Sequence, residues 1–176
     1  MTDNAVQTDG DRNGLLRTRT FSWEDPLTGV QAATELAGLD YLRAMQAGTL
    51  PPPPLLNVLE MRLESVESGV VVFGMTPAEF HYNPIGSVHG GVYSALLDSA
   101  AGCAVHSLLP AGTGYTSQDL SVRFLGAIRV DTGPVRCTGT VRHFGRRTAL
   151  AEASLETTGG KLLATATSSC LILNGR

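Results

Sequence analysis

The chain has 176 residues, of which 43% are hydrophobic and 16% charged, and its formal net charge is −3 at pH 7. This length and composition are typical of one globular domain with a sizeable core. The acidic balance excludes a global basic surface for nucleic acid. No early segment has the pattern of a signal peptide, and no apolar stretch is continuous enough to span a bilayer. We therefore expect a cytoplasmic protein that binds neither nucleic acid nor membrane.

The first 50 residues form an N-terminal extension in this interpretation. Residues 1 to about 20 are polar, and we expect them to be disordered or loosely attached. From about residue 29 to 47, apolar side chains recur at steps of three and four, which predicts one amphipathic helix. Prolines 51–54 then make a stiff spacer that no helix can cross. We place the main domain at 51–176.

The main domain alternates between strand and helix signals. A short helical turn is expected at 55–59, followed by two strands joined by the hairpin signal Glu67-Ser68-Gly69 and by a short turn or helix at 76–80. A long apolar helix comes next, then a break, then four strands. The expected strands are 60–66, 70–75, 115–128, 134–144, 148–157 and 161–173. This order predicts an α+β domain, which a long antiparallel sheet curled around one buried helix would satisfy.

The stretch 83–102, NPIGSVHGGVYSALLDSAAG, carries the strongest functional signal. From Gly90 to about residue 108 it is apolar on almost every side, which predicts a buried helix. The sequence places one carboxylate in this helix, Asp98, although an Asp is rarely buried without a partner. Ser94, Asp98 and Gly102 recur at four-residue steps and so share one face. Either that face lines a cavity, or Asp98 is exposed or meets a structural partner.

The start of this helix is a second candidate feature. Gly90 and Gly91 leave the backbone bare, and the first N–H groups of a helix are unpaired and carry partial positive charge. Such an end can bind an anion or polarise a carbonyl oxygen. The alternative interpretation is a tight turn that needs the conformational freedom of glycine.

These features together resemble a known family. His89-Gly90-Gly91, with Asp98 seven positions after the second glycine and Asn83 six before the histidine, is similar to the active-site segment of hotdog-fold acyl-CoA thioesterases. The closest branch is the phenylacetate-degradation (PaaI-like) and 4-hydroxybenzoyl-CoA thioesterase group. The similarity continues through TSQDLSVRFL at 116–125 and GRRTA at 145–149, and covers roughly residues 55–174.

The resemblance implies the hotdog fold and a thioester hydrolase that converts an acyl- or aryl-CoA to free acid and coenzyme A. It implies that the Gly90 N–H polarises the thioester carbonyl and that Asp98 is the general base or the nucleophile. Asn83 would hold water or substrate, His89 would support the loop, and Ser117 would position water near Asp98. The family shares this site across a homodimer, which can assemble further into a homotetramer. Asn83 and Gly90 of one chain would then face Asp98 and Ser117 of the other.

Further residues are expected to contact the substrate. Gly91, Ser94 and Gly102 lie on the helix that carries Asp98. Arginine suits the phosphates of coenzyme A because it forms bidentate hydrogen bonds. The cluster Arg142, Arg146 and Arg147 could hold the nucleotide, or could be a solvated turn.

One departure from the family pattern concerns the same phosphates. Relatives often carry Arg-Pro after the Phe-Leu pair, but here Phe124-Leu125 is followed by Gly126-Ala127. Arg123 or Arg129 would have to substitute. The preferred acyl group and the choice between coenzyme A and acyl carrier protein are left open by the sequence.

The resemblance implies no cofactor, because coenzyme A enters as part of the substrate. The cysteines are odd in number without short spacings, and the histidines have no ligand spacing, so we expect neither a disulfide framework nor a metal site. Two alternatives of other classes remain. One is a non-catalytic protein that binds acyl-CoA or an acyl ligand, and the other is a hotdog hydratase or dehydratase that uses His89 and Asp98.

Overall fold

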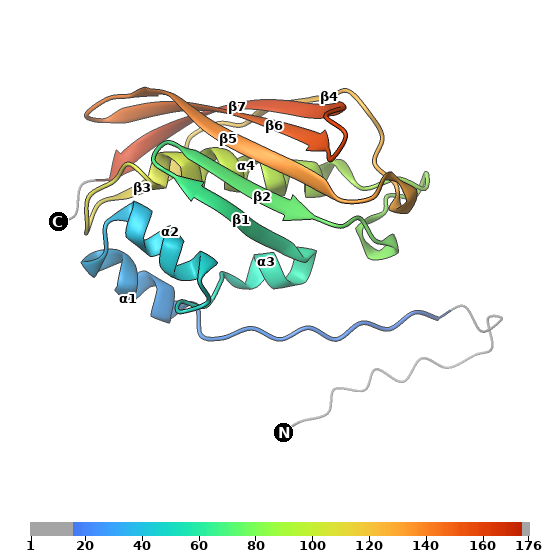
Figure 1. Cartoon of the computed structure of the whole chain (residues 1–176), viewed down its shortest axis with the longest axis horizontal. Helices are drawn as coiled ribbons and strands as arrows, with labels where there is room; N and C mark the ends of the chain where they lie inside the picture. The colour runs from blue at the N-terminus through green and yellow to red at the C-terminus, as the bar shows by residue number, and fades with distance from the viewer. Residues whose placement is uncertain (1–15, 174–176) are drawn as a thin grey trace.

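One antiparallel sheet wraps around a central helix in the computed structural model, which describes residues 16–173. In Figure 1 strands β5, β6 and β7 lie above the central helix α4, β1 and β2 pass below it, and three N-terminal helices lie beneath these strands. The helices are α1 (Leu27–Glu35), α2 (Gly38–Gln46), α3 (Pro54–Leu59) and α4 (Gly90–His106), with 3-10 turns η1 (Glu79–His81) and η2 (Val130–Thr132). The strands are β1 (Met61–Glu67), β2 (Val70–Met75), β3 (Gly114–Ser117), β4 (Ser121–Phe124), β5 (Val135–Phe144), β6 (Thr148–Thr157) and β7 (Leu162–Leu173).

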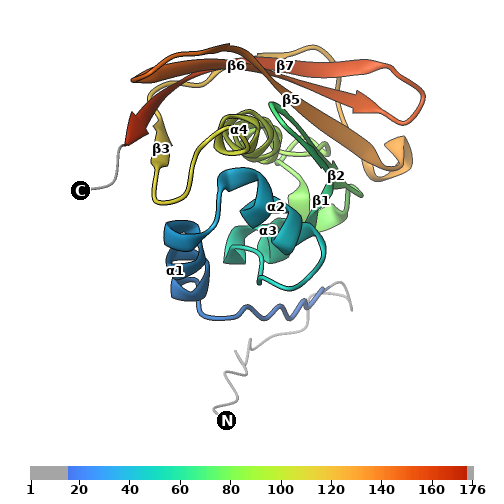
Figure 2. The ribbon, with the colours of Figure 1, turned by 60° about the vertical axis from the view of Figure 1, so that its left-hand side comes forward.

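The seven strands form a single sheet in the order β1-β2-β5-β6-β7-β3, and β4 also pairs with β7. Figure 2 looks nearly along α4 and shows the sheet curving over this helix, with α2 and α3 on its other side. The predicted α+β architecture and the hotdog fold, with a helical N-terminal extension, are therefore confirmed.

Small residues allow α4 to lie directly on the sheet. Ala100, Ala101 and Ala104 are completely buried. Gly139 of β5 faces the helix so closely that a Cβ there would collide with the carbonyl oxygen of Ala100. A helix that buries this much of its circumference must be apolar all round, as the sequence of α4 is.

The single helix predicted over residues 29–47 is wrong, because the chain breaks between α1 and α2. Leu36 has an extended backbone (φ −99°, ψ 141°) and ends α1. The N–H of Gly38 then donates to the carbonyl of Leu109 over 2.9 Å, and Gly38 lies against the backbone of His106. Contacts with the far end of α4 therefore override the local helical periodicity.

The long strand predicted over 115–128 is also divided, so five strands rather than four follow α4. The chain leaves the ladder between β3 and β4, where Asp119 bonds to β7 in another way. Its carboxylate accepts from the backbone N–H of Ser169 (2.9 Å), and its carbonyl accepts from the hydroxyl of Ser168 (2.8 Å). The other strands match their predicted positions to within two residues.

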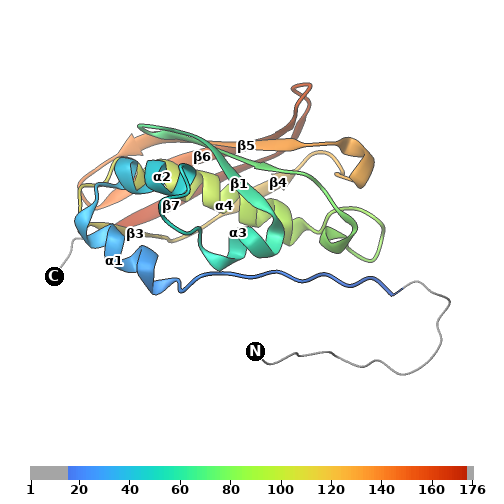
Figure 3. The ribbon, with the colours of Figure 1, turned by 60° about the horizontal axis from the view of Figure 1, so that its bottom comes forward.

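The N-terminal extension covers the side of α4 that the sheet leaves open. Figure 3, in which the bottom of Figure 1 comes forward, shows α2 and α3 in front of the sheet, with the extended segment before α1 running past α3. Leu42 of α2 is 1% exposed and belongs to the core. None of the helices within residues 16–173 is long and apolar enough to cross a membrane.

Candidate active site

Asp98 lies in an open groove between α4 and the edge strand β3. Its side chain is paired with Ser117, whose hydroxyl donates to Asp98 Oδ1 over 2.8 Å. Both residues are partly exposed. The groove has a volume of about 450 Å³ and is lined by Gly91, Ser94, Ala95, Asp98, Ser117, Gln118, Asp119 and Leu120. The face of α4 predicted to line a cavity does so at Ser94 and Asp98, and a carboxylate with a positioned hydroxyl is suited to general-base or nucleophilic chemistry.

Ser94 and Gly102 differ from the sequence-based expectation in detail. The Ser94 hydroxyl donates to the carbonyl of Gly90 over 3.0 Å and is therefore committed to its own helix. The space expected at Gly102 is filled, because the hydroxyl oxygen of Tyr115 lies 2.6 Å from the position that a Cβ of residue 102 would occupy. Neither Gly102 nor Tyr115 lines the groove.

Asn83 organises the loop that leads into α4. Its carboxamide oxygen accepts from the backbone N–H groups of Ile85 (3.0 Å) and Ser87 (3.2 Å), and its amide nitrogen donates to the Ser87 hydroxyl (3.0 Å). These bonds are those of a turn-forming Asn. Asn83 nevertheless lines a pocket of about 360 Å³ together with Gly90 and the ring of Phe124.

His89 caps α4 and leaves the next N–H group available. Its Nδ1 accepts from the N–H of Gly91 over 2.9 Å, and its own N–H donates to the carbonyl of His81 over 2.8 Å. The N–H of Gly90 has no hydrogen-bond partner among residues 16–173. An unpaired donor at a helix N-terminus can stabilise negative charge on a substrate oxygen.

The two halves of the expected site are separate within one chain. Asn83 and Gly90 line one pocket, whereas Asp98 and Ser117 line the other. Apolar side chains near the Gly90 pocket are unusually exposed, with Phe124 at 56% and Leu125 at 59%.

The arginines expected to hold phosphates do not gather at either pocket. Arg123 and Arg142 line a shared depression on the outer face of the sheet, where the Arg142 guanidinium also donates to Glu152 over 2.7 Å. Arg146 and Arg147 are exposed at the turn between β5 and β6. Their role in coenzyme A binding stays a prediction.

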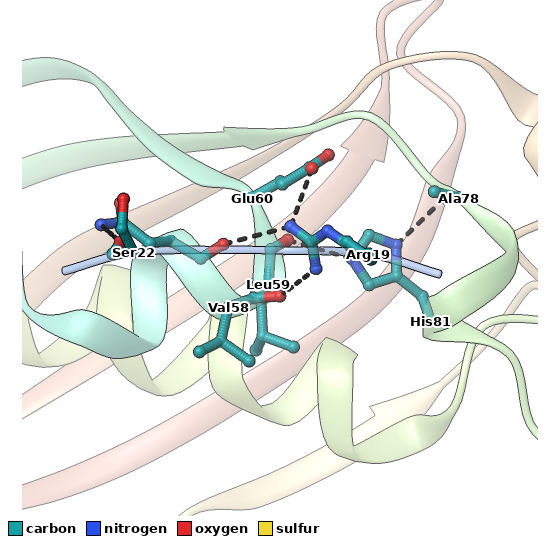
Figure 4. Close-up of polar contacts among 8 residues, drawn as sticks. Arg19, Ser22, Val58, Leu59, Glu60, Ala78 and His81 are labelled. Carbon is teal, nitrogen blue, oxygen red and sulfur yellow. Dashed lines mark hydrogen bonds and ion pairs between the residues drawn. The ribbon is translucent and has the colours of Figure 1, made fainter. Parts of the chain in front are cut away.

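Figure 4 shows a group of contacts that sequence reasoning missed. His81 is 2% exposed, and its ring joins the carbonyl of Leu59 (3.0 Å) to the N–H of Ala78 (3.0 Å). Burial lowers the pKa of His81, and the nearby Arg19 adds to this effect, while the Leu59 carbonyl and Glu60 oppose it. Because the His81 carbonyl also receives the His89 N–H, this histidine fixes the loop to the end of α3.

Arg19 anchors the segment that was expected to be loosely attached. Its guanidinium donates to the carbonyls of Val58 (2.7 Å) and Asn57 (3.2 Å) and to the carboxylate of Glu60 (2.7 Å), and it stacks 3.8 Å from the ring of Phe80. That expectation is therefore wrong at Arg19, while residues 1–15 lie outside the described residues. No local sequence signal marks Arg19, because its partners are about 40 residues away.

The three cysteines are poorly suited to act as nucleophiles. All three are free thiols, and burial raises the pKa of Cys103 to about 12, with Asp98 adding to the rise. A protonated buried thiol is a poor nucleophile. Within the part of the chain that the structure describes, no three His, Cys, Asp or Glu side chains are grouped so that they could hold a metal ion.

The chain is similar to known thioesterases both in sequence and in structure. A sequence model of the thioesterase superfamily matches residues 85–164, a span that contains Gly90, Asp98 and Ser117. No curated protein matches the chain.

Several solved structures are similar to this chain over nearly their whole length. A phenylacetic acid degradation-related protein from Ralstonia eutropha JMP134 is 27% identical, with a TM-score of 0.68 over 74% of this chain and 98% of that one. A thioesterase family protein from Silicibacter pomeroyi is 25% identical, with a TM-score of 0.67 over 76% and 96%. The PaaI protein of the E. coli phenylacetic acid degradation operon is 22% identical, with a TM-score of 0.68 over 80% and 97%. The chain thus has the hotdog fold of these structures, and its residues 85–164 are similar to the thioesterase superfamily.

Proposed function

We propose that the protein is an acyl-CoA thioesterase in which Asp98 drives hydrolysis and the Gly90 N–H stabilises the oxyanion. The observation that carries this proposal is the 2.8 Å hydrogen bond from the Ser117 hydroxyl to Asp98 Oδ1 in an open groove. The bond orients the carboxylate and leaves Oδ2 without a partner among residues 16–173. The free oxygen is available to a water molecule or to a substrate carbonyl carbon.

The proposed reaction uses Asp98 Oδ2 and the Gly90 N–H. As general base, Oδ2 takes a proton from water while the water oxygen attacks the thioester carbonyl carbon. The oxyanion that forms accepts a hydrogen bond from the Gly90 N–H. Its collapse breaks the carbon–sulfur bond, and the coenzyme A thiolate takes the proton from Asp98. As nucleophile, Asp98 would instead displace the thiolate and form a mixed anhydride that water then hydrolyses.

We further propose that the site forms between two copies of the chain. One chain holds the Gly90 and Asp98 pockets apart, so that neither pocket is complete alone. Among the described strands β3 pairs only with β7, which leaves one edge of β3 free beside the Asp98 groove. A two-fold dimer across this edge would create two identical sites, each with Gly90 from one protomer and Asp98 from its partner. The exposed Phe124 and Leu125 near Gly90 favour a covered surface there.

The test is thiol release from a panel of phenylacetyl-, hydroxybenzoyl-, butyryl-, octanoyl- and palmitoyl-CoA. The phenylacetic acid degradation proteins among the similar structures favour the aryl members. Wild type should release thiol from at least one member, and Asp98→Asn should lose about 10²- to 10⁴-fold in rate, the usual contribution of a general base.

One matched control variant and two further assays make the result interpretable. Asp40→Asn changes an exposed helical carboxylate on α2 and should retain the wild-type rate. An unchanged rate in a folded Asp98→Asn variant would overturn the mechanism. Thermal stabilisation by acyl-CoA without thiol release would instead support a binding protein, and hydration of crotonyl-CoA would support a hydratase.

A further inference from the structure

Three aromatic rings pack together one helical turn beyond Asp98, on the Gly102 side of the groove. The hydroxyl of Tyr115 lies against Gly102, 2.6 Å from the position of a Cβ there. The ring of Tyr115 meets His106 edge-on, with centroids 5.7 Å apart. On its other side His106 stacks with Tyr41 of α2 at 5.2 Å. The stack therefore runs from β3 across α4 to the N-terminal extension.

The register of β3 against α4 places Tyr115 directly beyond the catalytic pair. Ser117 and Tyr115 are two positions apart on the strand and so point to the same side. Their partners Asp98 and Gly102 are one helical turn apart, which corresponds to about 6 Å along the axis. Tyr115 thus occupies the position next to Asp98 at the far end of the groove, and neither Gly102 nor Tyr115 lines the open part.

The groove is asymmetric, and this orients a substrate. At the other end it opens at Gly91, which is exposed, beside the polar residues Gln118 and Asp119. The nucleotide and pantetheine of a coenzyme A thioester are too large and polar for the closed end. With the thioester carbonyl at Asp98, the acyl group is therefore directed towards Tyr115.

We propose that Tyr115 is the floor of the acyl pocket and limits the substrates to short or single-ring acyl-CoA thioesters. The inference rests on the proposed thioesterase function and names its substrate class. Tyr115 cannot easily turn aside, because its ring is held between Gly102 and His106, and His106 is held in turn by Tyr41. The N-terminal extension contributes to specificity through this last contact.

The electrostatics of the floor fit an apolar or neutral acyl group. Burial raises the pKa of Tyr115 well above its ordinary value, and Cys103, Cys170 and Asp98 add to the rise. The phenol therefore stays neutral through the working range of a thioesterase. A carboxylate at the end of the acyl chain would lie close to the Asp98 carboxylate, and two like charges repel each other.

The experiment measures kcat/KM against acyl length for wild type and Tyr115→Ala, with butyryl-, hexanoyl-, octanoyl-, decanoyl- and phenylacetyl-CoA. For wild type, kcat/KM should be high for butyryl-, hexanoyl- and phenylacetyl-CoA and should drop sharply for the longer acyl chains. Tyr115→Ala should raise kcat/KM for octanoyl- and decanoyl-CoA by about 10-fold or more, the scale on which pocket size discriminates methylene groups. Tyr115→Phe keeps the ring and should keep the wild-type length limit. Thr116→Ala changes the exposed neighbour on the opposite side of β3 and should also keep it.

A second variant tests the opposite direction and guards against misfolding of Tyr115→Ala. Gly102→Ala favours the helix and pushes the Tyr115 hydroxyl towards the groove, so the phenylacetyl rate should fall more than the butyryl rate. Active wild type whose length profile is the same in folded Tyr115→Ala and Gly102→Ala would overturn the role of Tyr115. Wild type that releases no thiol from any member would instead refute the proposed function.

Discussion

The two ends of α4 are built in opposite ways. At the N-terminal end the Gly90 N–H has no partner within residues 16–173, and the apolar side chains of Phe124 and Leu125 beside it are more than half exposed. At the C-terminal end the Ser107 hydroxyl donates to the Ala104 carbonyl (2.7 Å) and accepts from the Gly69 N–H (2.8 Å).

The C-terminal end of α4 thus anchors the helix in the fold, whereas its N-terminal end carries the groups of the proposed reaction. The C-terminal end is held by α2, whose Gly38 N–H bonds to the Leu109 carbonyl, and by the stacked rings of Tyr41 and His106. Because its C-terminal end is anchored, α4 keeps a fixed position even though the Gly90 N–H at its N-terminal end has no partner among residues 16–173. The groups that the chain leaves unsatisfied, the Gly90 N–H and one oxygen of Asp98, are the ones that the proposed reaction needs.

At the N-terminal end of α4, the reactive end in the proposed mechanism, the largest effect is expected from removing the Gly90 hydrogen-bond donor. Gly90→Pro removes the N–H but suits the first position of a helix, and the extended His89 (φ −64°, ψ 138°) tolerates a following proline. We expect the rate of thiol release to fall about 10²- to 10³-fold, as for loss of one oxyanion donor. Gly90→Ala, which keeps the N–H, is the matched control and should remain much more active.

The same variant tests whether the reactive end serves the partner protomer. When Gly90→Pro and Asp98→Asn subunits are mixed and allowed to exchange, half of the dimers are mixed and each has one intact site. Activity should then recover to about a quarter of wild type, from the statistics of two-fold pairing. No recovery after exchange, verified by mass spectrometry of the intact dimers, would place the complete site within one chain.

The next effect concerns the anchored end. Gly38→Ala places a Cβ against the backbone of His106 and should destabilise the fold by about 1–3 kcal/mol, the range for overpacked sites. Urea unfolding measures this change. Gly159→Ala in the turn between β6 and β7 meets only an ordinary contact at 3.7 Å and is the control. Equal stability of the two variants would show that α2 does not anchor α4.

Sequence patterns predicted the parts of the fold whose cause is local. The apolar run of α4 and the alternation of apolar residues along β5 are set by which face each side chain occupies. The breaks at Leu36–Gly38 and at Asp119 escaped prediction because the bonding partners are distant in sequence. The Leu109 carbonyl accepts from the Gly38 N–H, and the backbone and hydroxyl of two β7 serines donate to Asp119.

The candidate site divides in the same way. Asp98 and Gly90 are visible in one short segment, as a carboxylate in an apolar helix and a glycine at its start. Ser117 could be named only from the family resemblance, since a serine on a strand has no signal of its own. The sequence did not single out Tyr115, because the position of its ring depends on how β3 is aligned with Gly102 of α4.

A smaller effect is expected from the cap of the reactive end. His89→Ala removes the acceptor of the Gly91 N–H and should cost about 1 kcal/mol of stability, the usual value for an N-cap. The measurement is urea unfolding, with the exposed His143→Ala as control. If His89 only caps the helix, thiol release by the folded variant should fall far less than in Gly90→Pro. A loss as large as that of Gly90→Pro would instead give His89 a direct role in the reaction.

The smallest expected effect is a pH dependence at the base of the reactive loop. The buried ring of His81 accepts from the Ala78 N–H and meets the Leu59 carbonyl, so only the neutral ring satisfies both contacts. Because burial lowers its pKa in the folded state, the unfolded chain binds the proton more readily. Stability from this residue is therefore complete above about pH 6.5, the ordinary histidine pKa, and is lost as the pH falls towards the folded-state pKa.

Urea unfolding at pH 7.5 and 5.5 measures this loss in wild type and in His81→Gln. The variant should be less stable at pH 7.5, because it loses the ring contacts, but its stability should change less between the two pH values. Its remaining pH dependence includes the contribution of His106, whose pKa burial also lowers. An identical pH dependence in wild type and His81→Gln would show that the loop is not held by a neutral histidine, and that the reactive end of α4 has its anchor elsewhere.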